Sequence, residues 1–335
     1  MPLLNVGITG IGASAPEKVL TNADLEKMVE TSDEWIRHRT GIRERRICTD
    51  AEATSDLAVE AAQMALASAG VQPEELDLIV NATMTPDRLW PSAASTIQGR
   101  LGAVEAGAFD VNAACSGFVY ALAMGTQMVR TGLYRKVLVI GADVVSKFLD
   151  WTDRNICVLF GDGAGAVLLE PVSEAEEGIV NFFLGSDGTR GDIMYLPAGG
   201  SRLPPSHRTL DQGLHAPLMD GYETFQFATW AIMDSIQNVL ANTRYQVQDV
   251  DLFVPHQANV RIINTAARWL EAPISKFSIT IDRYGNTVAA SIPLCLYEEV
   301  RAGRLKKGDV VVLTSFGSGL TWASALLRWT CASPK

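Results

Sequence analysis

One cysteine lies in a stretch that is typical of a nucleophile. The segment FDVNAACSGFVYAL around Cys115 reads as a short strand, a turn of small residues and an apolar-periodic helix that ends near Gly132. The free N–H groups and the positive dipole at a helix start favour an anion, so we expect a lowered thiol pKa and a thiolate that attacks carbonyl carbons. The alternative interpretation is a buried cysteine that acts as a small hydrophobic residue.

Three further segments, all in the second half of the chain, carry groups that complement a thiol. His256 follows the apolar run DLFV and a proline, and it precedes an apolar-periodic helix. Asn286 lies in the glycine-containing turn RYGNT before another helix, and Phe316 to Gly319 form a glycine loop whose backbone N–H groups could face a developing oxyanion. Cysteine, histidine, asparagine and such a loop together predict covalent acyl transfer.

The two halves of the chain resemble each other, and strands alternate with helices in both. The similar pairs are VQPEELDLIVNAT with YQVQDVDLFVPHQ, KVLVIGAD with DVVVLTSF, and FGDGAGAVLLEP with FGSGLTWASALLRW. We therefore predict an α/β fold made of two copies of one unit, divided into residues 1–175 and 176–335. Such repetition brings the Cys115 and His256 corners toward one central cleft.

The glycines of FGDGAGAVLLEP could be mistaken for a phosphate-binding loop. Gly161, Gly163 and Gly165 precede the run AVLLEP, which reads as a strand, whereas a pyrophosphate loop needs a helix N-terminus at that place. These glycines are therefore interpreted as points of close backbone approach.

The amino-acid composition indicates in which cellular environment the protein works and which binding partners it can have. The 335 residues have a formal net charge of −10, so no nucleic acid partner is expected, and an acidic partner needs a local basic patch. The five scattered cysteines form no CxxC pair, which argues against a disulfide framework or a zinc site. No apolar stretch approaches the roughly 18 residues that span a bilayer, and the N-terminus reads as a strand. We expect a soluble cytoplasmic protein.

Basic residues concentrate in one short segment of this acidic chain. Trp35 shares it with several arginines, namely Arg37, Arg39, Arg43, Arg45 and Arg46. The segment is either a solvated charge run or a site for a phosphorylated ligand, in which arginines hold phosphate and the indole offers a flat face to a base.

Taken together, the motifs resemble a known family. DVNAACSGFVYAL, VPHQAN, RYGNT and FGSGLTW, with TSDEWI and RTGI near the start, are similar to the β-ketoacyl-acyl carrier protein synthase III family of the thiolase-like superfamily, over essentially the whole chain. The resemblance implies a layered αβαβα thiolase-like fold and a homodimer. It also implies that the protein starts fatty acid synthesis by condensing a short acyl-CoA, such as acetyl-CoA, with malonyl-acyl carrier protein, without a cofactor or a metal.

The resemblance also implies roles for individual residues. Cys115 would accept the acyl group, His256 and Asn286 would hold the malonyl thioester oxygen during decarboxylation, and the backbone N–H groups of Cys115 and Ser318 would form the oxyanion hole. The acyl pocket would be closed by Phe316 and by the Trp90 of a partner subunit, where a bulky indole suggests a short primer. Coenzyme A would contact Thr31, Trp35, Arg39, Arg154 and Asn259, and the carrier protein would contact Gln257, Ala258, Asn259, Val260 and Arg261, with Arg268 nearby.

Two departures and two alternatives accompany this interpretation. Gln226 and Trp269 stand where relatives often have basic residues, which affects the details of carrier docking. The alternatives are a related ketosynthase that makes a quinolone or polyketide starter unit, and a non-catalytic acyl-CoA-binding protein that has kept the fold.

Overall fold

Two β-sheets form the centre of the computed structural model, which describes residues 3–173, 175 and 177–331. The first sheet has the strand order β1-β7-β6-β4-β5, and the second has the order β11-β12-β13-β8. The strands of the first sheet are β1 (Asn5–Ser14), β4 (Leu78–Ala82), β5 (Gly107–Val111), β6 (Val137–Asp143) and β7 (Gly163–Val172). Those of the second are β8 (Ile179–Ser186), β11 (Leu252–Pro255), β12 (Val310–Gly317) and β13 (Thr321–Arg328).

The sheets repeat each other strand by strand, as the sequence repeats predict. β4 pairs with β6 in parallel and β6 with β7 antiparallel, and β11, β12 and β13 pair in the same way. β1 and β8 occupy the matching outer positions. At the place that β5 holds in the first sheet, the second has an isolated parallel bridge between Phe253 and Phe277. The second copy therefore keeps the order of the first, with its last strand reduced to one bridge.

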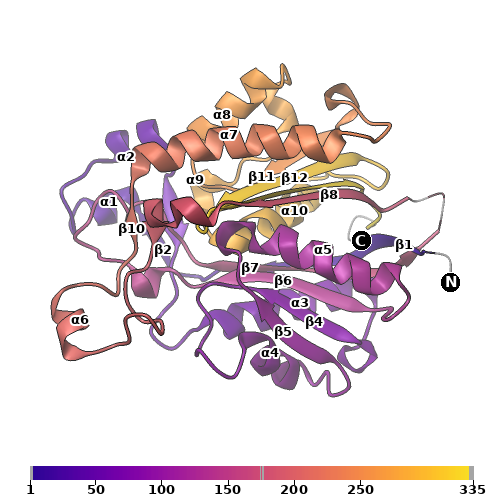
Figure 1. Cartoon of the computed structure of the whole chain (residues 1–335), viewed down its shortest axis with the longest axis horizontal. Coiled ribbons are helices and arrows are strands. Elements are labelled where there is room, and N and C mark those ends of the chain that lie inside the picture. The colour runs from indigo at the N-terminus through magenta and orange to yellow at the C-terminus, as the bar shows by residue number, and fades with distance from the viewer. Residues whose placement is uncertain (1–2, 174, 176, 332–335) are drawn as a thin grey trace.

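Helices cover both sheets and fill the space between them, which gives five layers (Figure 1). α5 (Gly117–Arg130) and α10 (Ser291–Arg301) lie between the sheets, and their apolar side chains share one core with strands of both sheets. α3 (Thr54–Ala69) and α4 (Ala93–Leu101) cover the outer face of the first sheet, and α7 (Gly221–Leu240) and α8 (Val260–Trp269) cover that of the second. The predicted αβαβα thiolase-like fold is confirmed.

Smaller elements complete the chain. A long excursion between β8 and α7 carries α6 and extends from the body of the molecule (Figure 1). These elements are β2 (Val19–Thr21), α1 (Asn22–Leu25), α2 (Asp33–Thr40), β3 (Glu44–Arg46), β9 (Met194–Tyr195), α6 (His207–Asp211), β10 (Leu218–Met219) and α9 (Ile281–Tyr284). Within the described residues no helix is both long and apolar enough to cross a membrane. The boundary predicted between residues 175 and 176 involves residue 176, which lies outside the described residues. The division of the chain into two units at this point stays a prediction.

The glycines of FGDGAGAVLLEP lie where backbone and side chains approach closely. A Cβ atom on Gly161 would lie 2.2 Å from the Tyr284 carbonyl oxygen, and one on Gly165 would lie 2.7 Å from Cβ of Pro293 in α10. The segment continues as strand β7, so no helix N-terminus is present to hold a phosphate. The interpretation of these glycines as close-approach sites is confirmed.

Replacing Gly165 tests how tightly α10 packs on the first sheet. Gly165→Ala should lower the free energy of unfolding by about 1–3 kcal/mol. The added methyl group overlaps Pro293, and the closely packed atoms around it can move only slightly to make room. Gly99→Ala in α4 is the matched control. A Cβ there meets nothing within 4 Å, and alanine should raise stability by about 0.5–1 kcal/mol. Urea denaturation of both variants measures the difference, and equal effects would contradict the packing described here.

Candidate active site

Cys115 lies at the corner between the first sheet and the central helix α5. β5 ends at Val111, a 3₁₀ turn spans Ala114–Ser116, and α5 begins at Gly117. Ala114 has a φ of 46°, and its backbone N–H donates to Oδ1 of Asn112 at 3.3 Å, which shapes the turn. Cys115 is 6 % exposed and lines a cavity of about 90 Å³ with His256, Asn286 and Phe316. The predicted strand, turn and helix are confirmed, with the cysteine two residues before the helix.

The environment of the thiol differs from the expectation. Burial removes water from a sulfur anion and, together with the nearby Asp143 carboxylate, raises the pKa of Cys115 to about 12; the residue's own backbone N–H acts in the opposite direction. The expected lowered pKa is therefore wrong for the ligand-free protein, since desolvation outweighs the helix start. The thiol is therefore protonated at neutral pH.

His256 reaches the same cavity from the second half of the chain. It follows β11, precedes α8 and is 1 % exposed. Its Nδ1 atom lies 2.6 Å from Oγ of Ser291, whereas Nε2 is buried and has no hydrogen-bond partner among the described residues. The ring meets Phe316 edge to face at 5.3 Å between centroids. Burial lowers the pKa of His256 to about 3, so the imidazole is neutral.

Asn286 is held so that its amide nitrogen is free for a ligand. Its backbone N–H donates to the Leu159 carbonyl at 2.9 Å, and its carbonyl accepts from Gly161 N–H at 3.0 Å. The side-chain Oδ1 accepts from the Val288 N–H at 2.9 Å, which fixes the amide orientation. Nδ2 makes no hydrogen bond to another residue in the part of the chain that the structure describes. The asparagine therefore presents an N–H donor beside the His256 ring.

The glycine loop after β12 lies directly against the nucleophile. A Cβ atom on Gly317 would lie 2.7 Å from the Cys115 backbone nitrogen, so only glycine permits this approach. Thr321 Oγ1 donates to the Ala113 carbonyl at 3.0 Å, and Ser318 Oγ donates to the Met194 carbonyl. Thr321 Oγ1 also lies 3.2 Å from the Ser318 carbonyl oxygen, and Ser318 lines one pocket with Ala113 and Ala114, so the backbone of Ser318 lies close to the Cys115 turn.

Two residues of the basic segment, Trp35 and Arg39, form an aromatic and cationic cluster with Arg154 at α2. Cζ of Arg39 lies 5.0 Å from the Trp35 ring centroid, and Cζ of Arg154 lies 5.5 Å from it. Arg154 also donates to the Glu30 carbonyl at 3.1 Å, and Oγ1 of Thr31 is buried without a partner among the described residues. The structure thus brings these predicted ligand contacts together. Asn259, the fifth predicted contact, caps α8 and lines the catalytic cavity.

The five residues predicted to meet a carrier protein do not share one surface. Gln257 is 1 % exposed, and both ends of its side-chain amide are used internally. Nε2 donates to the Pro255 and Ser278 carbonyls, and Oε1 accepts from the Thr280 and Ile281 N–H groups. Direct contact of Gln257 with a docking protein is therefore a wrong prediction, because the side chain holds the loop before α9.

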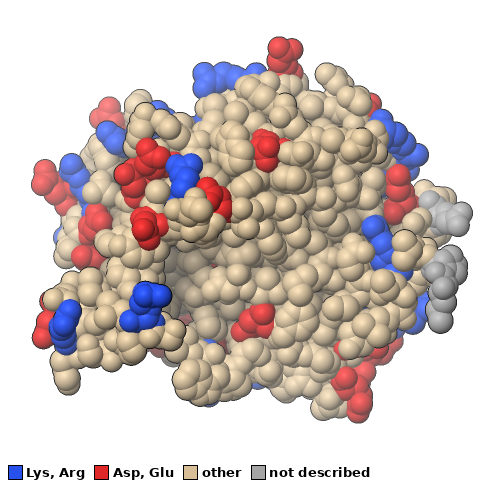
Figure 2. Space-filling model, in the orientation of Figure 1, with Lys and Arg blue, Asp and Glu red and all other residues tan. Residues whose placement is uncertain are grey.

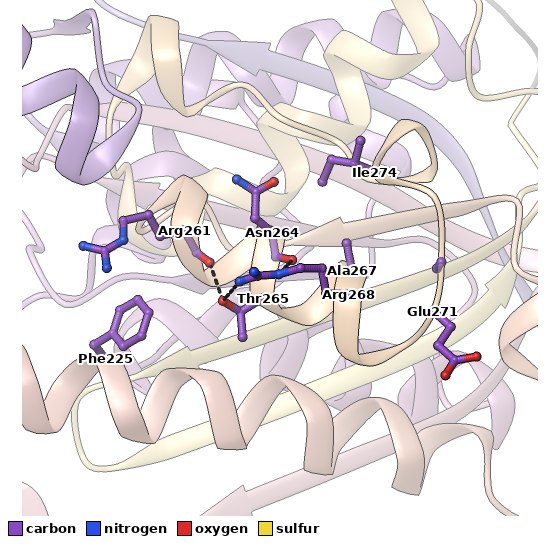
Figure 3. A pocket seen from close by; sticks show the side chains of 9 residues that line it. Phe225, Arg261, Asn264, Thr265, Ala267, Arg268, Glu271 and Ile274 are labelled. Atoms are coloured by element: carbon purple, nitrogen blue, oxygen red, sulfur yellow. Dashed lines mark hydrogen bonds between the residues drawn. The ribbon is translucent and has the colours of Figure 1, made fainter.

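The other members of that segment face different ways. Ala258 and Asn259 line the catalytic cavity, and Val260 packs against Gly41, where a Cβ would lie 2.7 Å from Cγ1 of the valine. Arg261 is exposed, with Cζ 5.5 Å from the Phe225 ring centroid. It borders a surface groove of about 720 Å³ along α8 (Figure 3).

The two aromatic residues predicted for the acyl pocket lie apart. Phe316 is 2 % exposed and lines the cavity with Cys115. Trp90 is 79 % exposed, and the neighbouring Leu89 is 73 % exposed, so in a single protomer the indole covers nothing. On the other side of the Cys115 turn, a pocket of about 490 Å³ is lined by residues that include Ala113, Ala114 and Ser318.

Sequence reasoning missed two buried groups, Ser291 and Asp143. Oδ1 of Asp143 accepts from Thr83 Oγ1 at 3.0 Å and from Thr85 Oγ1 at 2.8 Å, and Oδ2 accepts from the Ala289 N–H at 3.1 Å. The carboxylate thus joins the end of β6 to the segment that carries Asn286. Burial raises its pKa to about 6. An aspartate at a strand end gave no signal by itself, because strand ends commonly carry turn residues.

The raised thiol pKa has a kinetic signature. Alkylation of Cys115 by iodoacetamide should accelerate about tenfold per pH unit from about pH 7 to 10 without a plateau, because only the thiolate reacts. Asp143→Asn removes the negative charge that raises the pKa, so the rate should be higher at every pH. Asp162→Asn, a buried carboxylate that bonds Cys48 and Ser146, should leave the rate unchanged. A Cys115→Ser blank isolates the signal, and a plateau near pH 8 would contradict the assignment.

Comparison with known proteins shows the family of the chain. The model of the family described as 3-oxoacyl-[acyl-carrier-protein (ACP)] synthase III matches residues 109–188, and the model of its C-terminal part matches residues 240–329. The chain is 52% identical over 324 residues to the β-ketoacyl-[acyl-carrier-protein] synthase III of Caldanaerobacter subterraneus subsp. tengcongensis, covering 97% of this chain and 98% of the relative.

Solved structures give the same result. The synthase III of Thermus thermophilus is 45% identical, with a TM-score of 0.90 over 96% of this chain and 99% of that one. The priming β-ketosynthase from the R1128 polyketide biosynthetic pathway is 33% identical, with a TM-score of 0.90 over 100% of this chain and 99% of that one. Identity at this level over nearly the whole length shows common descent. The chain belongs to the 3-oxoacyl-[acyl-carrier-protein] synthase III family.

Proposed function

We propose that the protein condenses acetyl-CoA, or another short acyl-CoA, with malonyl-acyl carrier protein to give a 3-oxoacyl-acyl carrier protein, the initiating reaction of fatty acid synthesis. The observation that carries the proposal is a cavity lined by Cys115, His256 and Asn286, in which Nε2 of the histidine and Nδ2 of the asparagine have no hydrogen-bond partner among the described residues. We also propose a cytoplasmic location. It is supported by the cysteines that form no disulfide among the described residues, namely Cys48, Cys115, Cys157 and Cys295.

The first half-reaction is acyl transfer to Cys115. The sulfur attacks the thioester carbon, and the carbonyl oxygen becomes an oxyanion that the backbone N–H groups of Cys115 and Ser318 receive. The tetrahedral intermediate then expels the coenzyme A sulfur, which takes up the proton that the thiol has lost. The close approach of Gly317 to the Cys115 nitrogen supports this pairing of donors.

The second half-reaction is decarboxylation and condensation. The malonyl carboxylate leaves as CO2, and its bonding electrons pass into an enolate whose oxygen accepts hydrogen bonds from His256 and Asn286. The enolate carbon attacks the acyl-cysteine, and the Cys115 thiolate leaves and is protonated again. Neutral donors suit this step because they stabilise charge in the transition state without pairing with the ground-state carboxylate. Each donor contributes about 2.7–4 kcal/mol if it acts as an oxyanion-hole donor does.

The cluster at α2 is proposed to bind coenzyme A. Trp35 and Arg154 would sandwich the adenine, and Arg39 would bind phosphate. The two guanidinium groups now lie over the indole, so an inserted base has to displace Arg154. Oγ1 of Thr31, which is buried without a partner in the part of the chain that the structure describes, and the half-buried Asn259 would supply further polar contacts.

The groove along α8 is proposed to receive the acidic carrier protein (Figure 3). Arg261 and Arg268 are exposed along this helix, and Arg268 donates to Oγ1 of Thr265 at 3.3 Å. Glu271 lies at the far end of the groove. Gln226 and Trp269 are exposed on the surrounding surface, so fewer cations face the carrier than the family pattern implies.

A homodimer is proposed from two features of the first sheet. Strand β5 lies at the sheet edge, where its unpaired backbone groups can pair with a second copy. The exposed Leu89 and Trp90 lie on the loop before α4, and a second copy would bury them. Figure 2 shows one face of the protomer, on which charged side chains gather mainly toward the edges and a broad area at the centre carries few. The indole of one protomer would then close the acyl pocket of the other.

A starter-unit ketosynthase remains the second candidate, favoured by the 33% identity to the R1128 priming enzyme. The quinolone or polyketide starter would need the same cysteine, histidine and asparagine. The identity of the carrier-bound product separates the two candidates.

Intact-mass measurement tests the assigned roles. Incubation with acetyl-CoA should add one acetyl group to Cys115, Cys115→Ser should remain unmodified, and acetoacetyl-acyl carrier protein should form when malonyl-acyl carrier protein is added. His256→Ala and Asn286→Ala should each keep the acetyl adduct and lose about 10²–10³-fold in decarboxylation. Absence of an adduct on the wild-type protein would leave only a binding role, and equal loss of acylation in all three variants would overturn the division of labour.

Primer choice tests the proposed place of Trp90. Trp90→Ala should raise acylation of Cys115 by octanoyl-CoA relative to acetyl-CoA by at least about tenfold, because a shortened side chain leaves room for apolar methylene groups. Trp269→Ala, which shortens an exposed tryptophan on α8, should leave the ratio unchanged. Competition between the two thioesters, read by mass, gives the ratio. An unchanged ratio in Trp90→Ala would place the indole outside the acyl pocket.

A further inference from the structure

Ser291 contacts the histidine that faces the catalytic cavity, and neither the motifs nor the comparisons assign it a role. It is the first residue of α10 and is 2 % exposed. Its Oγ lies 2.6 Å from Nδ1 of His256, on the opposite side of the ring from the buried Nε2. This is the only side-chain hydrogen bond of Ser291 among the described residues.

The contact decides which ring nitrogen carries the proton. A neutral imidazole has one N–H, and the other nitrogen is an acceptor. If Nδ1–H donated to the serine, the hydroxyl hydrogen would be buried without an acceptor among the described residues, which is unfavourable because the group has lost its hydrogen bonds to water. If the hydroxyl donates to Nδ1, its hydrogen is satisfied, and the ring proton must reside on Nε2. The second arrangement is the favoured one.

The consequence concerns the step that needs a donor. Nε2–H can donate to a thioester oxygen, whereas a bare Nε2 would repel that oxygen. Asn286, which lies five residues before Ser291, is oriented in a similar way. The Val288 N–H donates to its Oδ1, which leaves Nδ2 facing the ligand. The Ala289 N–H, which donates to Asp143, fixes the same segment to the first half of the chain.

We propose that Ser291 is a positioning residue, whose hydroxyl donates to Nδ1 and holds His256 as the tautomer with its proton on Nε2, directed at the malonyl thioester oxygen. The proposal rests on the proposed function for its substrate. The segment from Asn286 to Ser291 then sets both donors of the decarboxylation step, one through its own side chain and one through the histidine of another segment.

Nitrogen NMR on the whole protein tests the tautomer directly. The chain has four histidines, so labelling with ¹⁵N-histidine gives few signals, and the signal lost in His256→Gln identifies His256. The wild-type protein should show a protonated Nε2 and a bare Nδ1. A proton on Nδ1 would overturn the proposal whatever the enzyme catalyses, and this measurement needs no variant of Ser291.

Kinetics of Ser291→Ala test the consequence. Decarboxylation of malonyl-acyl carrier protein should fall about 10- to 100-fold, less than for loss of the whole donor, while acetylation of Cys115 stays within about twofold. The His256 signal should change to a mixture of tautomers. Ser235→Ala, which removes another buried serine hydroxyl bonded to Thr314 and Ser324, is the matched control and should change neither rate.

The outcomes separate this inference from the proposed function. Equal decarboxylation by Ser291→Ala and the wild-type protein would overturn the role of Ser291 and leave the condensing activity intact. A wild-type protein that acetylates Cys115 but never decarboxylates malonyl-acyl carrier protein would overturn the proposed function, while the tautomer remains decided by NMR.

Discussion

The catalytic cavity depends on direct backbone contact between the two halves of the chain. At Gly317 a Cβ atom would lie 2.7 Å from the Cys115 nitrogen, and at Gly141 it would lie 2.4 Å from the Ala289 carbonyl oxygen. Side chains would hold these segments apart, since packed interiors leave no room for an added methyl group. The two glycines therefore let the strand ends of one half touch the turns of the other. Asp143 adds a charged anchor across the same boundary.

Burial then sets the chemical state of every group in the cavity. The same loss of water raises the pKa of Cys115 to about 12 and lowers that of His256 to about 3, so both are neutral in the ligand-free protein. A neutral pair suits two half-reactions that share one site. The imidazole stays a hydrogen-bond donor and does not attract the malonyl carboxylate as a cation would. The thiol is protected from unwanted alkylation and oxidation until a thioester enters.

Patterns that depend on neighbours in the sequence were predictable. The strand, turn and helix around Cys115 lie where the sequence pattern predicts them, as β5, the turn over Ala114–Ser116 and α5. The internal repeats gave the two sheets because each repeated apolar run is a strand buried on both faces. The motifs also pointed to Cys115, His256 and Asn286, which line one cavity.

Properties that depend on distant packing were not predictable. The prediction of a lowered thiol pKa was wrong because the sequence does not show how much water reaches Cys115. Gln257 was misplaced because its four partners come from the chain at Pro255 and at Ser278 to Ile281, and only the fold joins them. Ser291 contacts His256 from 35 positions further along the sequence.

In the second sheet the edge strand that would match β5 is reduced to one bridge, which the sequence did not predict either. This difference between the sheets has a geometric consequence. Only the first sheet offers a full strand, β5, at that position, while the second offers one bridge at Phe277. The proposed pairing of protomers through β5 would be self-matching and would close after two copies, so it would not extend into an open-ended fibre.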